Sequence, residues 1–342
     1  MALRLPALKL ASAPGRSLGA LWEKHHWAVV AVWLAFMAGL MGADLYFTLR
    51  HNVPQPEAAV VVAPTPLPLV EGVDPVDLPL DPAPAAGLEV VQAEGKLPVM
   101  APDGRSPLGV YAYPFDRTEA RPRISIVLVD AGPQITLTGE ALRKLPGSVA
   151  LAYNAYTPSL GTAMASAREA GHETLLVIPA DAAGTLGYDP GPGAVRLGLS
   201  AADNMQRIRL LMGKATGYVG LLINPETALF NINGLPNALL DEAKARGIEL
   251  VSANQDFTDV GLEQKVPVAQ IALRLDSALS PAALEERLTE LEQRARESGH
   301  AVAISAIYPF VITKLAEWLP TLAHKGIAIA PVSAAAPLPA AP

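Results

Sequence analysis

The sequence predicts an α/β fold whose sheet is mostly parallel, either open or closed into a barrel. The first observation is the stretch Arg123–Gly132, where a run of apolar and β-branched residues ends at Asp130 and then a glycine. Such a continuous apolar run is typical of a strand buried on both faces. The second is that strand, loop and helix units repeat after it, which favours parallel strands. The roughly 210 residues that hold these units suit a single α/β barrel.

The N-terminal residues predict a membrane anchor. Residues 1–26 are basic, and we expect them to form a cytoplasmic tail. Residues 27–48 carry Asp44 as their only charge and reach the roughly 20 residues that a membrane-spanning helix needs. The basic flank predicts a single-pass protein of the inner (cytoplasmic) membrane, with its C-terminal domain on the periplasmic or extracytoplasmic side. The alternative is a cleaved signal peptide, but the basic region is long and Met41 stands where a small residue is wanted.

A linker follows the predicted anchor. Residues 49–96 are rich in proline and alanine, a composition typical of an extended, semi-rigid spacer. We therefore expect the folded domain to span 97–333 and residues 334–342 to form a disordered tail.

Within the domain, each helix is expected to end at a glycine, and a strand begins within a residue or two. Glycine is common there because it readily adopts the left-handed conformation that ends a helix. The helix Ser280–Ser298 has a serine cap, Pro281 in its first turn and Gly299 as its stop. After the first strand, the expected strands are 149–152, 174–178, 218–223, 248–251, 268–273, 301–304 and 327–330.

Polar residues at the C-terminal ends of these strands are the candidates for a site, because parallel barrels carry their functional groups there. A carboxylate pair made by Asp130 with Asp181 or Glu226 could perform acid–base chemistry. The alternative is that such carboxylates only cap loops. The strand-end residues are Asp130, Asn154, Asp181, Asn224, Glu226, Asn254, Asp256, Ser305, Tyr308 and Ser333.

Aromatic and amide side chains at the same ends could line a sugar-binding groove, because aromatic faces and amide hydrogen bonds recognise sugars. The alternative is that the tyrosines merely roof the barrel. The residues assigned to substrate binding are Tyr153, Asn154, Asn224 and Tyr308.

The histidines are expected at the opposite rim from Asp130. His172, His300 and His324 each lie at the start of a predicted strand. This placement argues against a metal site or a catalytic triad at Asp130, so we expect neither a metal nor another cofactor. The chain has no cysteine, and its net charge of -7 without a basic stripe argues against a nucleic-acid partner.

Residues 97–333 resemble the divergent polysaccharide deacetylases, a branch of the carbohydrate esterases with a deformed (β/α) barrel. The motifs that carry the resemblance are Arg123–Gly132, Ala170–Pro179, Asp189–Pro192, Leu199–Ser200 with Asn204, Gly217–Gly220, Trp318 and Pro331–Ser333.

The chain departs from the metal-dependent pattern of this family. The resemblance implies two aspartates at the end of the first strand, where Val129 and Asp130 stand. It implies histidines after the third and fourth strands, at Val177 and about Asn224, and a Gly-His-Pro-His type stretch where Ser305–Tyr308 lies. In the family, an Asp and two His hold a metal that activates water. The resemblance therefore implies that the metal ligands are missing.

Three hypotheses follow. The first is a membrane-anchored protein of the cell envelope that lacks metal-dependent hydrolysis and acts as a glycan-binding or interaction module. The second is an active carbohydrate deacetylase, a hydrolase of N-acetyl groups, in which Asp130 is the base and Asp181 or Glu226 assists. The third is a scaffold for another envelope protein, such as a cell-wall hydrolase or its regulator.

Overall fold

The structure is a computed structural model that describes residues 79–183 and 189–336. The predicted anchor at 27–48 and the tail at 1–26 lie outside the described residues. None of the helices within the described ranges is both long and apolar enough to cross a membrane.

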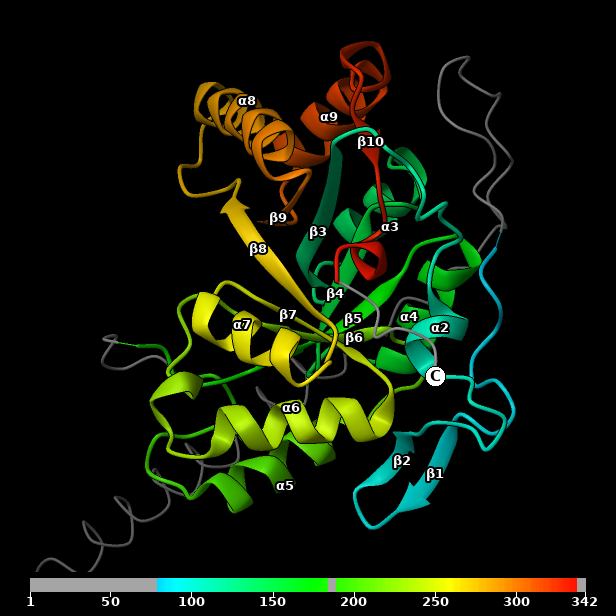
Figure 1. Cartoon of the computed structure of the whole chain (residues 1–342), viewed down its shortest axis with the longest axis vertical. Coiled ribbons are helices and arrows are strands. Elements are labelled where there is room, and N and C mark those ends of the chain that lie inside the picture. The colour runs from blue at the N-terminus through cyan, green and yellow to red at the C-terminus, as the bar shows by residue number, and fades with distance from the viewer. Residues whose placement is uncertain (1–78, 184–188, 337–342) are drawn as a thin grey trace, which may run out of the picture. The chain divides into compact units, whose positions relative to one another are not determined.

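The sheet is a closed parallel barrel, which settles the alternative between an open and a closed sheet (Figure 1). Strands β3 to β9 are neighbours in chain order, and β9 pairs with β3 to close the ring. The short β10 pairs with the first residues of β3. Further along, the same edge of β3 pairs with β4. The strands are β3 (Arg123–Ala131), β4 (Ala150–Asn154), β5 (Thr174–Ile178), β6 (Gly220–Ile223), β7 (Glu249–Ser252), β8 (Val268–Arg274), β9 (His300–Ala306) and β10 (Ala328–Ile329).

Helices surround the barrel and follow the predicted capping pattern. The Ser280 side chain accepts a hydrogen bond from the Ala283 amide, and α8 ends at Gly299 with a φ of 80°. Glycine suits that left-handed position because it has no Cβ. The helices of the ring are α3 (Ile135–Lys144), α4 (Leu160–Glu169), α5 (Ala201–Met212), α6 (Leu235–Arg246), α7 (Gln255–Glu263), α8 (Pro281–Ser298) and α9 (Pro309–Trp318).

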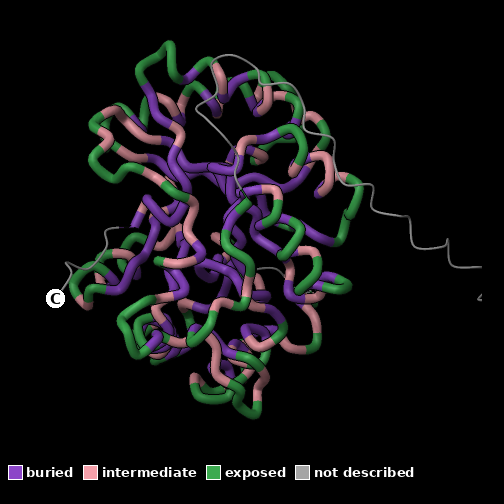
Figure 2. The backbone as a smooth tube through the Cα atoms, turned by 90° about the vertical axis from the view of Figure 1, so that its right-hand side faces the viewer, coloured by how far each residue is buried: buried purple, intermediate pink, exposed green. Residues whose placement is uncertain are grey.

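Two apolar cores lie on the two faces of the sheet. Successive side chains of a strand point to opposite faces. Ile126 and Leu128 of β3 therefore join the outer core beneath the helices, whereas Val127 and Val129 join the core inside the barrel. Figure 2 shows the buried residues gathered in the interior, with exposed residues at the periphery. Continuous burial on both faces explains why the strands read as unbroken apolar runs.

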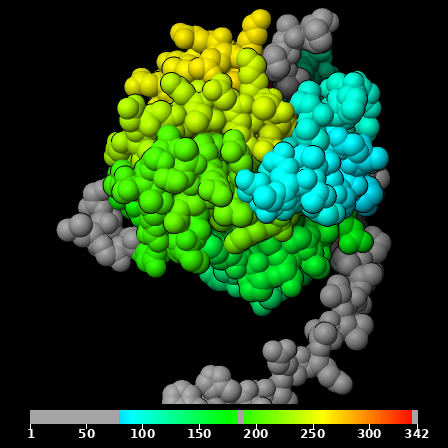
Figure 3. All heavy atoms as spheres, turned by 90° about the horizontal axis from the view of Figure 1, so that it is seen from below, coloured from blue at the N-terminus to red at the C-terminus, as the bar shows by residue number. Residues whose placement is uncertain are grey.

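The N-terminal end of the barrel is covered by segments from both ends of the described chain. The lead-in contains the antiparallel hairpin of β1 (Glu89–Gln92) and β2 (Gly95–Pro98), followed by α2 (Pro107–Tyr111). Figure 3 shows this cyan segment packed beside the green helices α5 and α6. The single turn η4 (Val332–Ala334) contributes Val332 to the core inside the barrel.

These segments correct both predicted domain boundaries. The predicted linker at 49–96 contains β1 and part of β2, and Leu80 and Leu88 within it are buried. Ala334 and Ala336, at the start of the predicted tail, are also buried. The composition was misleading because a few leucines and alanines among the prolines bury apolar surface against the barrel.

Candidate functional site

The candidate site lies at the C-terminal rim of the barrel, on the left in Figure 1, where the arrowhead of β8 points. At the end of β3 the backbone is distorted, because Asp130 has a φ of 60° and the register with β4 shifts between Leu128 and Ala131. A positive φ is uncommon for a residue other than glycine. The distortion leaves Asp130 exposed between Val129 and Ala131, which are both buried.

Asp130 belongs to a charged cluster with Arg274, Asp276 and Glu226. Arg274 ends β8, and its Nε donates to Asp276 Oδ1 at 3.0 Å, while its Nη1 lies 3.3 Å from Glu226 Oε1. The Asp276 carboxylate also accepts the Ala306 amide at 3.2 Å. Although Asp130 is exposed, desolvation by the surrounding protein raises its pKa, the charge of Arg274 lowers that pKa, and the charge of Asp276 raises it. A raised pKa makes a carboxylate a better proton acceptor than a fully solvated one.

The sequence analysis missed Arg274 and Asp276. Both directly follow the predicted strand 268–273, so the rule that selected the other candidates also covers this strand end. The contact of Arg274 with Glu226, which follows β6, joins residues far apart in the sequence, so no local pattern indicates it.

Asp181 stands outside this cluster. Its carboxylate accepts Arg196 Nη1 at 2.9 Å and the Leu197 amide at 3.0 Å, and Nη2 of the same arginine donates to Asp189 at 2.6 Å. Asp181 therefore ties together the two described parts of the loop after β5. Of the two predicted partners of Asp130, the structure brings only Glu226 into the cluster.

The four residues predicted to bind sugar do not form one groove. The prediction for Tyr153 is wrong, because its side chain is fully buried in the outer core and its hydroxyl donates to the Ala163 carbonyl at 3.3 Å. Asn154 accepts the Tyr156 amide at 2.9 Å and so shapes its own loop. Asn224 and Tyr308 are half-buried at the ends of β6 and β9. The Tyr308 ring stacks on Phe310, with 5.7 Å between ring centroids.

The residues present do not fit the metal that the family resemblance implies. Val129 and Val177 stand at two implied ligand positions, and both are buried in the core inside the barrel. Apolar side chains cannot ligate a metal, and a catalytic zinc site normally needs three protein ligands. Within 79–183 and 189–336, no three His, Cys, Asp or Glu side chains are placed to hold a metal ion.

The histidines lie at the other rim, as the strand assignments predict. His300 begins β9, and its Nε2 lies 2.8 Å from the Ser125 hydroxyl. His172 precedes β5, and its Nδ1 lies 2.8 Å from the Val149 carbonyl. Neither imidazole can therefore reach Asp130 at the opposite end of the strands.

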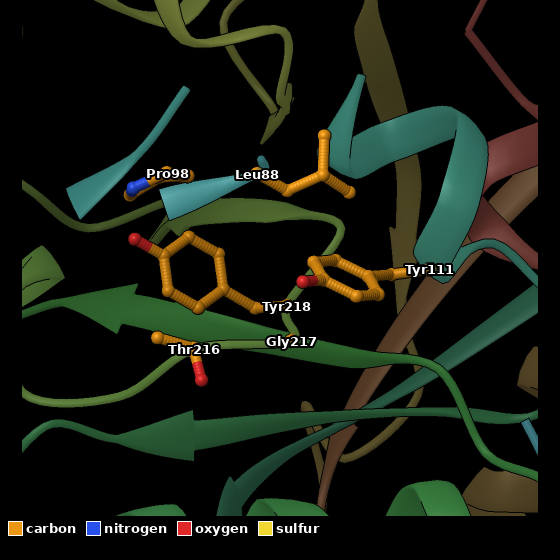
Figure 4. Close-up of a pocket in the computed structure, with 6 residues that line it drawn as sticks. All are labelled: Leu88, Pro98, Tyr111, Thr216, Gly217 and Tyr218. Carbon is orange, nitrogen blue, oxygen red and sulfur yellow. The ribbon is translucent and has the colours of Figure 1, made fainter. Parts of the chain in front are cut away.

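A small pocket also lies at the N-terminal end, between the lead-in and the start of β6. The hydroxyl of Tyr111 accepts the Ala85 amide at 2.9 Å, and that of Tyr218 donates to the Met212 carbonyl at 3.2 Å. The lining contains no carboxylate, histidine or amine, which makes it a gap in packing rather than a place for acid–base chemistry. Figure 4 shows the lining residues Leu88, Pro98, Tyr111, Thr216, Gly217 and Tyr218.

Comparison with known proteins agrees with this architecture. Residues 126–336 match the family model described as divergent polysaccharide deacetylase. The crystal structure of an uncharacterized protein from Agrobacterium tumefaciens is similar, with 29% sequence identity and a TM-score of 0.65. That similarity covers 70% of this chain and 99% of the other. No curated protein matches the chain.

Proposed function

This chain belongs to the divergent polysaccharide deacetylase family, and we propose that it works in the cell envelope as an interaction module without metal-dependent hydrolysis. The observation that carries the proposal is the replacement of metal-ligating positions by Val129 and Val177, which are buried among apolar side chains.

The proposed location rests on the sequence alone. The apolar segment 27–48 would anchor the chain, and its basic flank would keep residues 1–26 in the cytoplasm. The domain would then face the envelope glycans and the proteins that act on them. A reporter fused after Pro342 that is active only outside the cytoplasm tests this arrangement: activity is expected, and a silent reporter on a well-expressed fusion contradicts it.

The experiment for the chemistry uses the full chain, purified with detergent present. The protein is incubated with Zn²⁺, Co²⁺ or Mn²⁺, desalted and assayed for bound metal and for acetate released from N-acetylated glycan oligomers. We expect neither stoichiometric metal nor metal-dependent acetate release. Stoichiometric metal together with metal-dependent acetate release would contradict the proposal.

A second candidate function is carbohydrate deacetylation by the carboxylate cluster. The observation that favours it is Asp130, whose pKa is raised by desolvation and by the charge of Asp276 against the opposing charge of Arg274. A carboxylate tuned in this way is suited to general acid–base work.

Two variants test this candidate. Acetate release that disappears in Asp130→Asn, while Asp181→Asn retains it, would support a role for Asp130, because Asp181 binds Arg196 instead of the cluster. Equal release by the wild type and by Asp130→Asn would exclude that role.

A further inference from the structure

We propose that the C-terminal rim docks a protein segment that presents a basic side chain between aliphatic ones. The proposal rests on the function proposed above, an interaction module, and it names the surface used and the class of partner. Two independent features of the rim carry it: exposed aliphatic side chains and an excess of carboxylates.

Large aliphatic residues are exposed on the loops of this rim. Ile135 after β3 is 77% exposed, Leu279 after β8 is 68% exposed, and Leu197 after β5 is 49% exposed. Strands β8, β9 and β3 are neighbours in the ring, and α9 packs against both α3 and α8. Leu279, the Tyr308–Phe310 stack and Ile135 therefore follow one another along one arc. Leu197 lies apart from this arc, because β5 is not a neighbour of β8, β9 or β3. Exposed apolar side chains along one arc of a rim are typical of an interaction surface.

The charges of the rim leave two exposed carboxylates, Asp130 and Asp256, without an ion pair in the described part of the chain. The described charged residues at the strand ends, in the loops after them and in the first turn of α7 are Asp130, Asp181, Asp189, Arg196, Glu226, Asp256, Arg274 and Asp276. Arg196 is bonded to Asp181 and Asp189, and Arg274 to Asp276 and Glu226. Asp130 has no ion pair in the described part of the chain. An exposed anion within an acidic rim attracts a cationic partner group and sets its position.

Two of the aromatic residues near this rim, Tyr153 and Tyr156, are poorly placed to stack on sugars. Tyr153 is fully buried. Lys214 Nζ lies 4.7 Å from the centre of the Tyr156 ring, whose hydroxyl accepts the Gly193 amide. Recognition of sugars depends on exposed aromatic faces, whereas exposed isoleucine and leucine suit a protein surface. The rim therefore favours a protein partner over a glycan.

The experiment measures binding of three synthetic peptides of equal length to the full chain by fluorescence anisotropy. One alternates leucine and lysine, one leucine and glutamate, and one serine and lysine. We expect the leucine–lysine peptide to bind about tenfold more tightly than either other peptide, because it satisfies both the apolar and the charge requirement. Its affinity should fall with added salt.

Three variants test whether the peptide binds at the rim. The double variant Ile135→Asp, Leu279→Asp removes the aliphatic contacts, and Asp130→Asn removes one of the two unpaired charges. Both should weaken binding of the leucine–lysine peptide. The matched control is Leu262→Asp on α7, because Leu262 is also an exposed leucine, at 60%, but lies near the C-terminal end of its helix, away from the rim. This control should bind the peptide like the wild type.

Three results would overturn the inference. The first is that the leucine–glutamate peptide binds as tightly as the leucine–lysine peptide. The second is that Leu262→Asp weakens binding as much as the rim variants do. The third is that N-acetylglucosamine oligomers displace the leucine–lysine peptide. The acetate assay on the same preparation separates this inference from the proposed function. Metal-dependent acetate release removes the proposed function itself, whereas absence of both acetate release and peptide preference removes only the inference about the partner.

Discussion

The two ends of the barrel place their charged groups in opposite environments. At the C-terminal rim, Asp130 and Glu226 are exposed, and Arg274 is shared between two carboxylates. At the N-terminal end, Glu173 and Glu249 are completely buried. Active α/β barrels carry their chemistry at the C-terminal end. In this chain the strongest burial of titratable groups occurs at the other end, so burial of a carboxylate does not by itself mark a functional site.

The buried groups at the N-terminal end hold the closing segments in place. Glu173 accepts the Tyr113 amide at 2.7 Å, the Ser333 amide at 3.2 Å and the Ser333 hydroxyl. Arg168, which is 2% exposed, donates to the carbonyls of Asp81, Tyr111 and Gly217. One carboxylate thus joins the lead-in to η4, and one guanidinium joins the lead-in to the start of β6.

The largest expected effect is at Glu173. Replacement by alanine removes the acceptor of two buried donors and one half-buried donor near the charge of Arg168. We therefore expect Glu173→Ala to lower the free energy of unfolding by about 3–5 kcal/mol. Glu226→Ala at the opposite rim, where the side chain is 62% exposed, should change it by less than about 0.5 kcal/mol. Urea unfolding of both variants measures the contrast, and equal effects would mean that the two ends do not differ.

The next effect is at Gly220, whose missing side chain makes room for Glu249 inside the barrel. A Cβ at Gly220 would overlap the main-chain oxygen and Cγ of Glu249. We expect Gly220→Ala to cost about 1–3 kcal/mol of stability. Gly161→Ala in α4, where a Cβ meets open space, is the matched control and should be neutral or slightly stabilising. A neutral Gly220→Ala variant would show that the barrel interior can shift at this level.

The pH dependence of stability should report the buried glutamates. Both Glu249 carboxylate oxygens are buried without a hydrogen-bond partner among the described residues. Burial and the neighbouring Glu173 raise the pKa of Glu249 well above its ordinary value, while Arg117 lowers it. The folded protein therefore holds a proton that the unfolded chain releases above about pH 4.3. The stability contributed by this group is complete below that pH and falls as the pH rises toward the raised pKa.

Glu249→Gln should weaken this decline, which is at most about 1.4 kcal/mol per pH unit for one group. Part of the decline of stability with pH should remain in this variant, because burial raises the pKa of Glu173 as well. The measurement is urea unfolding at several pH values above pH 5, with Glu226→Gln as the exposed control. A Glu249→Gln variant that keeps the full wild-type slope would contradict the raised pKa. His300 acts in the opposite direction at lower pH, because burial and Arg123 lower its pKa to about 4.

The smallest effect is expected at Arg274. Arg274→Met removes the positive charge that lowers the pKa of Asp130, so that pKa should rise, while stability falls by only about 1 kcal/mol. An NMR titration of the Asp130 carboxyl measures the shift. Arg196→Met, which removes an arginine bound to Asp181 and Asp189, should leave the pKa of Asp130 unchanged. A pKa of Asp130 that falls or stays constant in Arg274→Met would separate Arg274 from the cluster.

Local patterns predicted the elements of this fold well. Helix Ser280–Ser298 begins and ends where its serine and glycine predict, and β5 has the predicted bounds of 174–178. The side-chain directions were harder to predict. Tyr153 was assigned to the rim but points beneath α4, because a shift of one residue moves a strand side chain to the other face.

The sequence by itself determined the order of strands and helices, the parallel sheet and the rim on which Asp130, Glu226 and His300 lie. These properties depend on burial and capping, which act over a few neighbouring residues. The prediction for Ser333 was wrong, because it lies in η4 at the N-terminal end, where it bonds to Glu173. Only the tertiary structure decided that β3 pairs with β9, that Arg274 reaches Glu226 and that the lead-in closes the barrel. Those contacts join residues far apart in the chain, and no local pattern specifies which distant partner a strand edge or a charge will meet.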